Sequence, residues 1–295
     1  MPQSATTRFV TPAPGVRLWT ETRGAADGSP LLLVMGGQAS GLCWPEGLVE
    51  RLAAHHRVIR YDHRDTGRSS RTFDQAPYRV TDLAADIVGV LDGLGVERAH
   101  LVGMSLGGML TQLVLADHPD RVLSATLFGT TALSTADLVH PDGTRTPVDK
   151  LPGIDPRLLE EWARPIEDLG PEAELDRRVR HWELLHGDAL PFDADYFRTM
   201  EREIIEHTGR YLTDYSHARA DDSGMLRTEA LAANRVPTLV VSAPADPVFP
   251  PPHPQHLAQA LGGARLTEIP GLGHSLPPQV HEPLAEAILS RTGAR

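Results

Sequence analysis

Short, mostly apolar runs recur along the first 130 residues, each followed by a polar loop or by a stretch with helical periodicity. Runs of this length predict strands buried on both faces of a sheet. The predicted strands are 31–34, 58–61, 99–102 and 123–128, and the predicted helices between them are 46–54, 81–94 and 106–116. This alternation predicts an α/β fold, a mostly parallel central sheet with helices on both faces.

The pattern changes at residues 131–232, which hold proline-punctuated helical patches, no convincing strand and seven of the 15 aromatic residues. The expected helices there are 157–169, 172–186 and 193–207. Afterwards strands return at 237–242 and 264–269, with helices at 255–261 and 281–289. We therefore expect a core of residues 1–130 and 233–295 and a helical lid, residues 131–232, that supplies an apolar pocket over the sheet.

Composition narrows the class of protein. The chain has 295 residues, of which 41% are hydrophobic and 23% are charged, a balance typical of soluble globular proteins. Its net charge of −11 argues against nucleic acid or a membrane as partner, and no apolar run is long enough to span a bilayer. No secretory leader is evident, and the single cysteine, Cys43, suits a reducing compartment, so a cytoplasmic monomer or homodimer is expected.

The candidate chemistry begins at Gly103-Met104-Ser105-Leu106-Gly107, a Gly-x-Ser-x-Gly motif between a predicted strand and a predicted helix. In that context a serine lies on a sharp turn with its hydroxyl exposed above a sheet. The motif alone is a weak signal among 26 glycines, and an ordinary tight turn is the alternative. The flanking strand and helix favour Ser105 as a nucleophile. Such a hydroxyl needs a base, a carboxylate to orient the base, and donors for an oxyanion.

Two residues further along the chain have the required character. Asp246 lies just past the predicted strand 237–242, and His274 lies in a glycine-rich loop after the last predicted strand. Carboxyl ends of parallel strands share one edge, so three distant loops can converge there. We expect His274 to take the proton of Ser105 and Asp246 to orient the imidazole. The other histidines are expected to be structural or on the surface.

The oxyanion donors are expected from backbone N–H groups. The Gly36-Gly37 pair follows the predicted strand 31–34, where it is either a simple strand-end turn or a close approach to the substrate. We favour the N–H groups of Gly37 and of Leu106, the residue after the nucleophile. The residues expected to line the substrate pocket are Gly36, Gln38, Trp44, Met104, Phe128 and Trp182.

A dense polar loop, Asp62 to Ser69, follows the predicted strand 58–61. His63 with Asp62 and Asp65 suggests a metal site, but no second imidazole lies nearby in the sequence. We therefore interpret the loop as an internally hydrogen-bonded turn and expect no metal in this protein.

Four stretches carry a resemblance to a known family: 31–37, 58–69, the serine turn, and 269–277. They resemble the α/β-hydrolase superfamily and, within it, anthracycline-tailoring esterases of the aclacinomycin methylesterase type. The resemblance implies hydrolysis of the methyl ester of a bulky aromatic polyketide, with Ser105, Asp246 and His274 as the triad. It also implies an acyl-enzyme, methanol as first product, water as second nucleophile, and no cofactor.

Other functions use the same residues. A lactonase, a C–C hydrolase, or a cofactor-free decarboxylase or haloperoxidase-like enzyme would keep the triad and change the bond, because chemistry on a fold depends on the site. A binding protein on the same scaffold is a third class, which often lacks one triad member. All three members are present here, so the sequence favours an enzyme, a serine carboxylesterase acting on a large apolar ester that is a small-molecule substrate.

Overall fold

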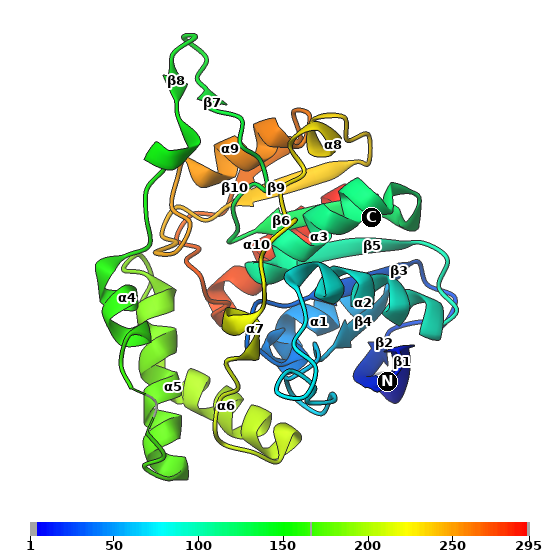
Figure 1. Ribbon diagram of the computed structural model, residues 1–295, viewed down its shortest axis with the longest axis vertical. Coiled ribbons are helices and arrows are strands. Elements are labelled where there is room, and N and C mark those ends of the chain that lie inside the picture. The colour runs from blue at the N-terminus through cyan, green and yellow to red at the C-terminus, as the bar shows by residue number, and fades with distance from the viewer. Residues whose placement is uncertain (1–4, 166, 294–295) are drawn as a thin grey trace.

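The computed structural model describes residues 5–165 and 167–293. Its main sheet has eight strands in the order β1-β2-β4-β3-β5-β6-β9-β10 (Figure 1). The bounds are β1 Thr6–Ala13, β2 Val16–Arg23, β3 Pro30–Val34, β4 Arg57–Tyr61, β5 Ala99–Met104, β6 Val122–Phe128, β9 Thr238–Ser242 and β10 Arg265–Glu268. All neighbours from β4 to β10 pair in parallel, whereas β2 pairs antiparallel with β1 and β4. The predicted mostly parallel sheet is confirmed, with an additional N-terminal hairpin.

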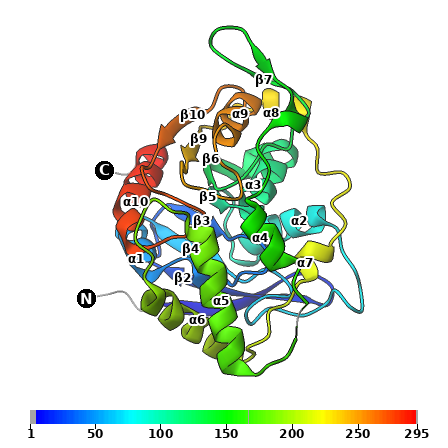
Figure 2. The same ribbon diagram turned by 90° about the vertical axis from the view of Figure 1, so that its left-hand side faces the viewer.

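Helices cover both faces of this sheet, as Figure 2 shows. One face carries α1 (Glu46–Ala53) and α10 (Pro278–Thr292). The other carries α2 (Val80–Gly93), α3 (Leu106–Asp117), α8 (Thr228–Ala232) and α9 (His253–Ala260). Alternate residues of the central strands face the two layers, so Leu31 and Leu33 join one apolar core and Leu32 and Val34 the other.

The segment between β6 and β9, which we call the insert, holds the remaining elements. They are β7 (Leu138–Val139), β8 (Arg145–Thr146), α4 (Pro156–Trp162), α5 (Pro171–His186), α6 (Ala194–Thr208) and α7 (Ser216–Arg219), followed by α8. Three short 3₁₀ turns complete the described part of the chain, at Gly41–Cys43, Pro119–Arg121 and Val148–Lys150. Helices α4, α5 and α6 lie together at one end of the sheet (Figures 1 and 2).

Two details of the insert differ from the sequence-based prediction. The short hairpin of β7 and β8 lies where no strand was expected, because two-residue strands leave no periodic pattern to detect. The helix expected at 157–169 ends at Trp162, since Pro165 disfavours helical geometry in the residue before it. The division of the chain into a core and a lid stays a prediction. Helix α8 lies at the predicted C-terminal end of the lid and packs against α3 and α9. No helix within the described ranges is long and apolar enough to cross a membrane.

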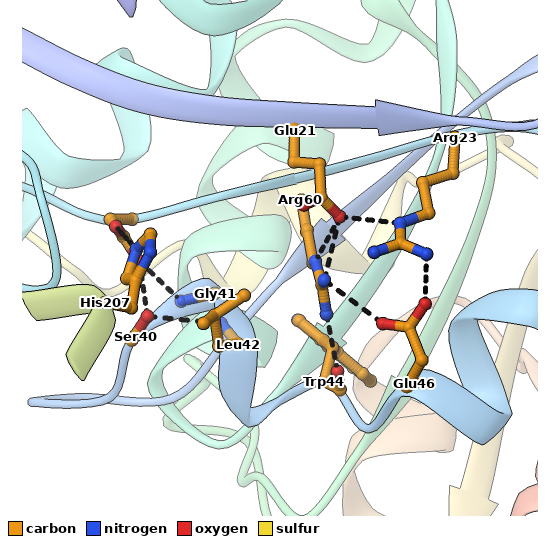
Figure 3. A network of polar contacts seen from close by, with 10 residues as sticks. Glu21, Arg23, Ser40, Gly41, Leu42, Trp44, Glu46, Arg60 and His207 are labelled. Atoms are coloured by element: carbon orange, nitrogen blue, oxygen red, sulfur yellow. Dashed lines mark hydrogen bonds and ion pairs between the residues drawn. The ribbon is translucent and has the colours of Figure 1, made fainter. Parts of the chain in front are cut away.

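A buried carboxylate joins the insert to the core. Asp62, just after β4, accepts hydrogen bonds from Ser40 Oγ (2.6 Å), from the Gly41 and Arg68 N–H groups (2.8 Å each) and from His207 Nε2 (2.8 Å) at the end of α6. Figure 3 shows Ser40 and His207 meeting at this point, beside a separate ion-pair cluster around Arg60. The polar loop of residues 62–69 is internally hydrogen-bonded, as predicted. Burial by itself would raise the pKa of the Asp62 carboxyl, but the contact with His207 and these donors holds it below its ordinary value.

Replacing Asp62 by asparagine is expected to lower the free energy of unfolding by about 2–4 kcal/mol. The amide keeps one acceptor oxygen and turns an NH₂ group toward the remaining donors, in a site with 0% exposure. Urea denaturation at neutral pH measures the loss. Asp74→Asn is the matched control, because Asp74 pairs with Arg219 in an exposed ion pair, which contributes about 1 kcal/mol or less. Equal losses in both variants would contradict a special role for the buried carboxylate.

The difference in the free energy of unfolding between wild type and Asp62→Asn is expected to depend on pH. The pKa of Asp62 is lower in the folded protein than in the unfolded chain, so the stabilisation is present above the unfolded pKa, about 3.9. It is lost as pH falls through the lower folded pKa. The difference between wild type and D62N should therefore shrink between about pH 5 and pH 3. A difference that grows on acidification would contradict this.

Candidate active site

Ser105 lies on the turn that joins β5 to α3. Its φ is 55°, in the left-handed region, and its N–H donates to the Phe128 carbonyl oxygen at 3.2 Å. Glycine is required at positions 103 and 107 because other backbone atoms lie where a Cβ would be. A Cβ on Gly107 would lie 2.0 Å from the Val34 oxygen, and one on Gly103 would lie 2.5 Å from the Gly107 oxygen. The sequence therefore forms the strained turn that presents a serine side chain above the sheet.

The three residues expected to act together are hydrogen-bonded in a chain. His274 Nε2 lies 3.0 Å from Ser105 Oγ, and His274 Nδ1 lies 3.0 Å and 2.9 Å from the two carboxylate oxygens of Asp246. Asp246 follows β9, and His274 follows β10. Since a carboxylate only accepts, Nδ1 carries the imidazole proton and Nε2 is left to accept from the serine hydroxyl.

The environment of Asp246 keeps its carboxyl ionised. The residue is 2% exposed, and it also accepts hydrogen bonds from the N–H groups of Val248 (2.7 Å) and Phe249 (3.0 Å). Burial by itself would raise its pKa, but the electrostatic interaction and hydrogen bond with His274 and the two backbone donors hold the pKa of Asp246 below its ordinary value. The charged form is thus available to orient the imidazole and to stabilise it when protonated.

The loop after β3 runs beside this turn. A Cβ on Gly36 would lie 3.2 Å from Ser105 Cβ, and one on Gly37 would lie 3.4 Å from Leu106 Cδ2. Leu106 is the first residue of α3, where backbone N–H groups point out of the helix and carry partial positive charge. Both Gly37 and Leu106 line the cavity described next. Their role as oxyanion donors stays a prediction.

A cavity of about 750 Å³ lies between the serine turn and the insert. Ser105 and His274 line it, together with four of the residues expected in the pocket, namely Gly36, Gln38, Met104 and Trp182. Trp44 and Phe128 were also expected there, and the structure corrects this. Their side chains are 0% and 1% exposed, their rings meet edge to face at 6.0 Å, and they belong to the apolar core under the sheet. Large aromatic side chains pack where they lose most contact with water.

Several cavity residues were not identified from the sequence. Trp162 at the end of α4, His181 on α5, His217 on α7 and Phe249 after β9 all line the cavity. Helical spacing would have identified part of this wall, since positions 177, 181 and 185 of the predicted helix 172–186 share one face. No local pattern identifies His217, because its partners lie elsewhere in the chain.

The His181 imidazole faces the cavity without a charge at neutral pH. Burial, and then the electrostatic influence of Arg177 and His274, lower the pKa of His181 to about 4. Its ring stacks on that of Trp162, with centroids 6.2 Å apart. Among the described residues, no three His, Cys, Asp or Glu side chains come together as a metal site would require.

Comparison with known proteins shows the family of this chain. Residues 29–278 match a family model described as the alpha/beta hydrolase fold. The chain is 44% identical over 285 residues to rhodomycin D methylesterase DnrP of Streptomyces peucetius, covering 95% of this chain and 96% of that protein. It is 32% identical to the putative carbamate hydrolase RutD of Variovorax paradoxus, covering 92% of each.

Solved structures show the same architecture. A hydrolase from Pseudomonas aeruginosa PA01 superposes with a TM-score of 0.69 at 27% identity, covering 98% of this chain and 99% of that one. The enol-lactonase from Burkholderia xenovorans LB400 superposes with a TM-score of 0.70 at 24% identity, covering 97% and 100%, a likeness of fold alone. The strained serine turn, the strand order and these matches lead to one conclusion: the chain belongs to the α/β-hydrolase fold family.

Proposed function

We propose that this protein is a serine carboxylesterase that hydrolyses the methyl ester of a bulky, anthracycline-like aromatic polyketide and releases methanol. The observation that carries the proposal is the hydrogen-bonded chain from Asp246 through His274 to Ser105, which opens into a cavity of about 750 Å³. The 44% identity to rhodomycin D methylesterase, over nearly the whole length of both chains, supports the substrate class.

Acylation follows from the positions of these groups. As Ser105 Oγ attacks the ester carbonyl carbon, His274 Nε2 accepts the hydroxyl proton, and Asp246 stabilises the resulting imidazolium. The N–H groups of Gly37 and Leu106 stabilise the negative charge that develops on the carbonyl oxygen. The tetrahedral intermediate then breaks its bond to the methoxy oxygen, which takes the proton from His274 and leaves as methanol. The acyl group remains on Ser105.

Deacylation repeats these steps with water. His274 Nε2 accepts a proton from a water molecule, whose oxygen attacks the acyl carbon, and the same N–H groups stabilise the second oxyanion. When the intermediate collapses, His274 returns the proton to Ser105 Oγ and the free acid leaves. These steps draw only on side chains, backbone N–H groups and water.

The experiment that tests the proposal offers the protein a panel of esters. It contains rhodomycin D, other methyl-esterified aromatic polyketides, a lactone and a substrate for C–C cleavage. We expect methanol to be released and the polyketide to lose one CH₂ in mass, the change from methyl ester to acid. Lactone opening or C–C cleavage, with no methanol from any methyl ester, would instead favour another activity of the same triad.

We further propose that the enzyme works in the cytoplasm on a small-molecule ester, with neither nucleic acid nor a membrane as partner. The net charge of −11 supports this, because polyanionic surfaces repel such a chain. The single cysteine, Cys43, is buried at the cavity wall, as expected for an apolar side chain in a reducing compartment.

Trp162 is expected to contact the aromatic part of the substrate. Its side chain lines the cavity yet is 45% exposed, which leaves one ring face for a planar ligand. Trp162→Ala should raise KM for the polyketide ester about ten-fold, because an aromatic contact contributes roughly 1 kcal/mol beyond its buried area. We expect KM for p-nitrophenyl acetate, which is too small to reach this wall, to stay unchanged.

The matched control for Trp162 is Leu226→Ala, since Leu226 is 60% exposed in the same insert and lies outside the cavity lining. Steady-state kinetics of both variants with both esters make the comparison. A KM that rises equally for the large and the small ester would contradict a contact with the polyketide.

A further inference from the structure

The loop after β3 holds a backbone conformation that depends on its neighbours. We call residues 35–38 the oxyanion loop, because they include the proposed donor Gly37. Gln38 has a φ of 57°, in the left-handed region. A residue other than glycine in such a region costs about 1–3 kcal/mol and persists only where the surroundings hold it there. The contacts of Gln38 therefore show what fixes the loop.

His217, from the insert helix α7, makes the contact to the backbone of Gln38. The Gln38 N–H donates to His217 Nδ1 at 3.0 Å, and His217 Nε2 donates to the Arg64 carbonyl oxygen at 2.8 Å. Because a carbonyl oxygen only accepts, the ring proton lies on Nε2 and Nδ1 is an acceptor. The ring is buried, and burial lowers the pKa of His217, so the imidazole stays neutral and keeps this acceptor at neutral pH.

Further contacts hold the same loop. With its amide nitrogen toward the Gly37 carbonyl, the Gln38 side chain donates to that oxygen (3.0 Å) and accepts from the Ala218 N–H (3.1 Å), so α7 contacts Gln38 twice. At the start of the loop, His63 Nε2 donates to the Met35 oxygen at 2.9 Å. The His63 and His217 rings meet edge to face, with centroids 5.6 Å apart. Burial lowers the pKa of His63 to about 3, so two neutral histidines hold the two ends of the loop.

We propose that His217 is a positioning residue of the oxyanion hole. Both of its ring nitrogens are already bonded to backbone groups of the core, which leaves neither for an ester at the cavity wall. By holding the Gln38 N–H it fixes the peptide that follows Gly37, while His63 holds the Met35 carbonyl, so the Gly36–Gly37 peptide, which carries the Gly37 N–H, is held from both sides. The insert thus contributes to the geometry of catalysis as well as to the pocket. This inference rests on the proposed ester hydrolysis, since the loop acts only where an oxyanion forms.

Two nearly isosteric substitutions separate positioning from structural support. His217→Leu removes the acceptor, whereas His217→Asn keeps a side-chain oxygen close to where Nδ1 lies. For p-nitrophenyl acetate we expect H217L to lower kcat about 10- to 100-fold, less than the loss of a whole oxyanion donor, with KM unchanged. H217N should recover most of this kcat. An unaltered kcat in H217L, or an equal loss in both variants, would overturn the proposal.

Phenylboronic acid gives a second measurement, independent of turnover. It adds to Ser105 Oγ as a tetrahedral anion, one oxygen of which occupies the oxyanion hole. We expect its inhibition constant to rise in H217L by the same factor by which kcat falls, and to recover in H217N. If H217L does not fold at the assay temperature, His217→Ala replaces it, and added imidazole should restore its kcat. Failure of that rescue would overturn the proposal.

His56→Leu is the matched control. His56 is likewise buried, with its ring nitrogens on the Ser29 carbonyl oxygen (3.2 Å) and on Thr292 Oγ1 (2.8 Å), away from the cavity. We expect a lower Tm and an unchanged kcat and boronate affinity. A wild-type protein that neither binds the boronate nor hydrolyses the ester would refute the proposed function itself. If the wild-type protein binds the boronate and hydrolyses the ester, but H217L binds the boronate equally tightly, only the positioning role is refuted.

Discussion

Ser105→Ala is expected to lower kcat for ester hydrolysis by about 10⁶-fold, the loss seen when a serine nucleophile is removed from a triad. Among the described residues, the Ser105 hydroxyl is the group hydrogen-bonded to His274 Nε2, at 3.0 Å, and both residues line the cavity. Alanine keeps the Cβ and adds no bulk, so the turn and the thermal stability should be unchanged. Rates with a methyl ester and with p-nitrophenyl acetate measure the effect.

Covalent labelling tests the same prediction without turnover. A fluorophosphonate should add one adduct mass to the wild-type protein, on Ser105, and none to S105A. The control is Ser124→Ala, because Ser124 is buried in β6 and hydrogen-bonded to His100 (2.8 Å), outside the cavity lining. This variant should label and turn over as the wild type does. An adduct on S105A, or substantial activity in it, would falsify Ser105 as the nucleophile.

The three residues that the sequence predicts to act together lie next to strand ends, and the structure brings their side chains within hydrogen-bond distance. Ser105 and Asp246 follow the buried strands β5 and β9, His274 follows the edge strand β10, and a parallel sheet brings the carboxyl ends of its strands to one edge. Local pattern plus topology is then sufficient, without knowledge of any side-chain contact. The same reasoning explains why the central strands β3, β4, β5, β6 and β9 could be predicted from short apolar runs.

Edges and long-range contacts are harder to predict. The hairpin of β1 and β2 was not predicted, because β1 is an edge strand with mostly exposed residues and so lacks an apolar run. Trp44 and Phe128 illustrate the opposite error, because both were predicted to line the pocket and packing placed them in the core. His217 shows the limit most clearly, since its partner Gln38 lies 179 positions away and no periodicity links the two.

Asp246→Asn is expected to lower kcat by about 10⁴-fold with little change in KM, through the tautomer of His274. The amide oxygen would accept the N–H groups of Val248 and Phe249 that now contact one carboxylate oxygen. Its NH₂ group would then face His274 Nδ1, which must give up its proton to accept from it. The imidazole proton would move to Nε2, the atom that has to accept from Ser105.

This effect is distinct from a loss of stability. Asp246 is 2% exposed, so D246N is expected to lower Tm as well, and activity is compared at a temperature where the variant is folded. Asp92→Asn, at a residue whose ion pair with Arg121 lies outside the cavity, provides the same chemical change and should leave kcat unaltered. Fluorophosphonate labelling of Ser105 should slow in D246N in proportion to kcat, because both reactions need Nε2 as a base. If labelling stayed fast while ester hydrolysis fell, the carboxylate would be required for release of the leaving group and not for activation of the serine.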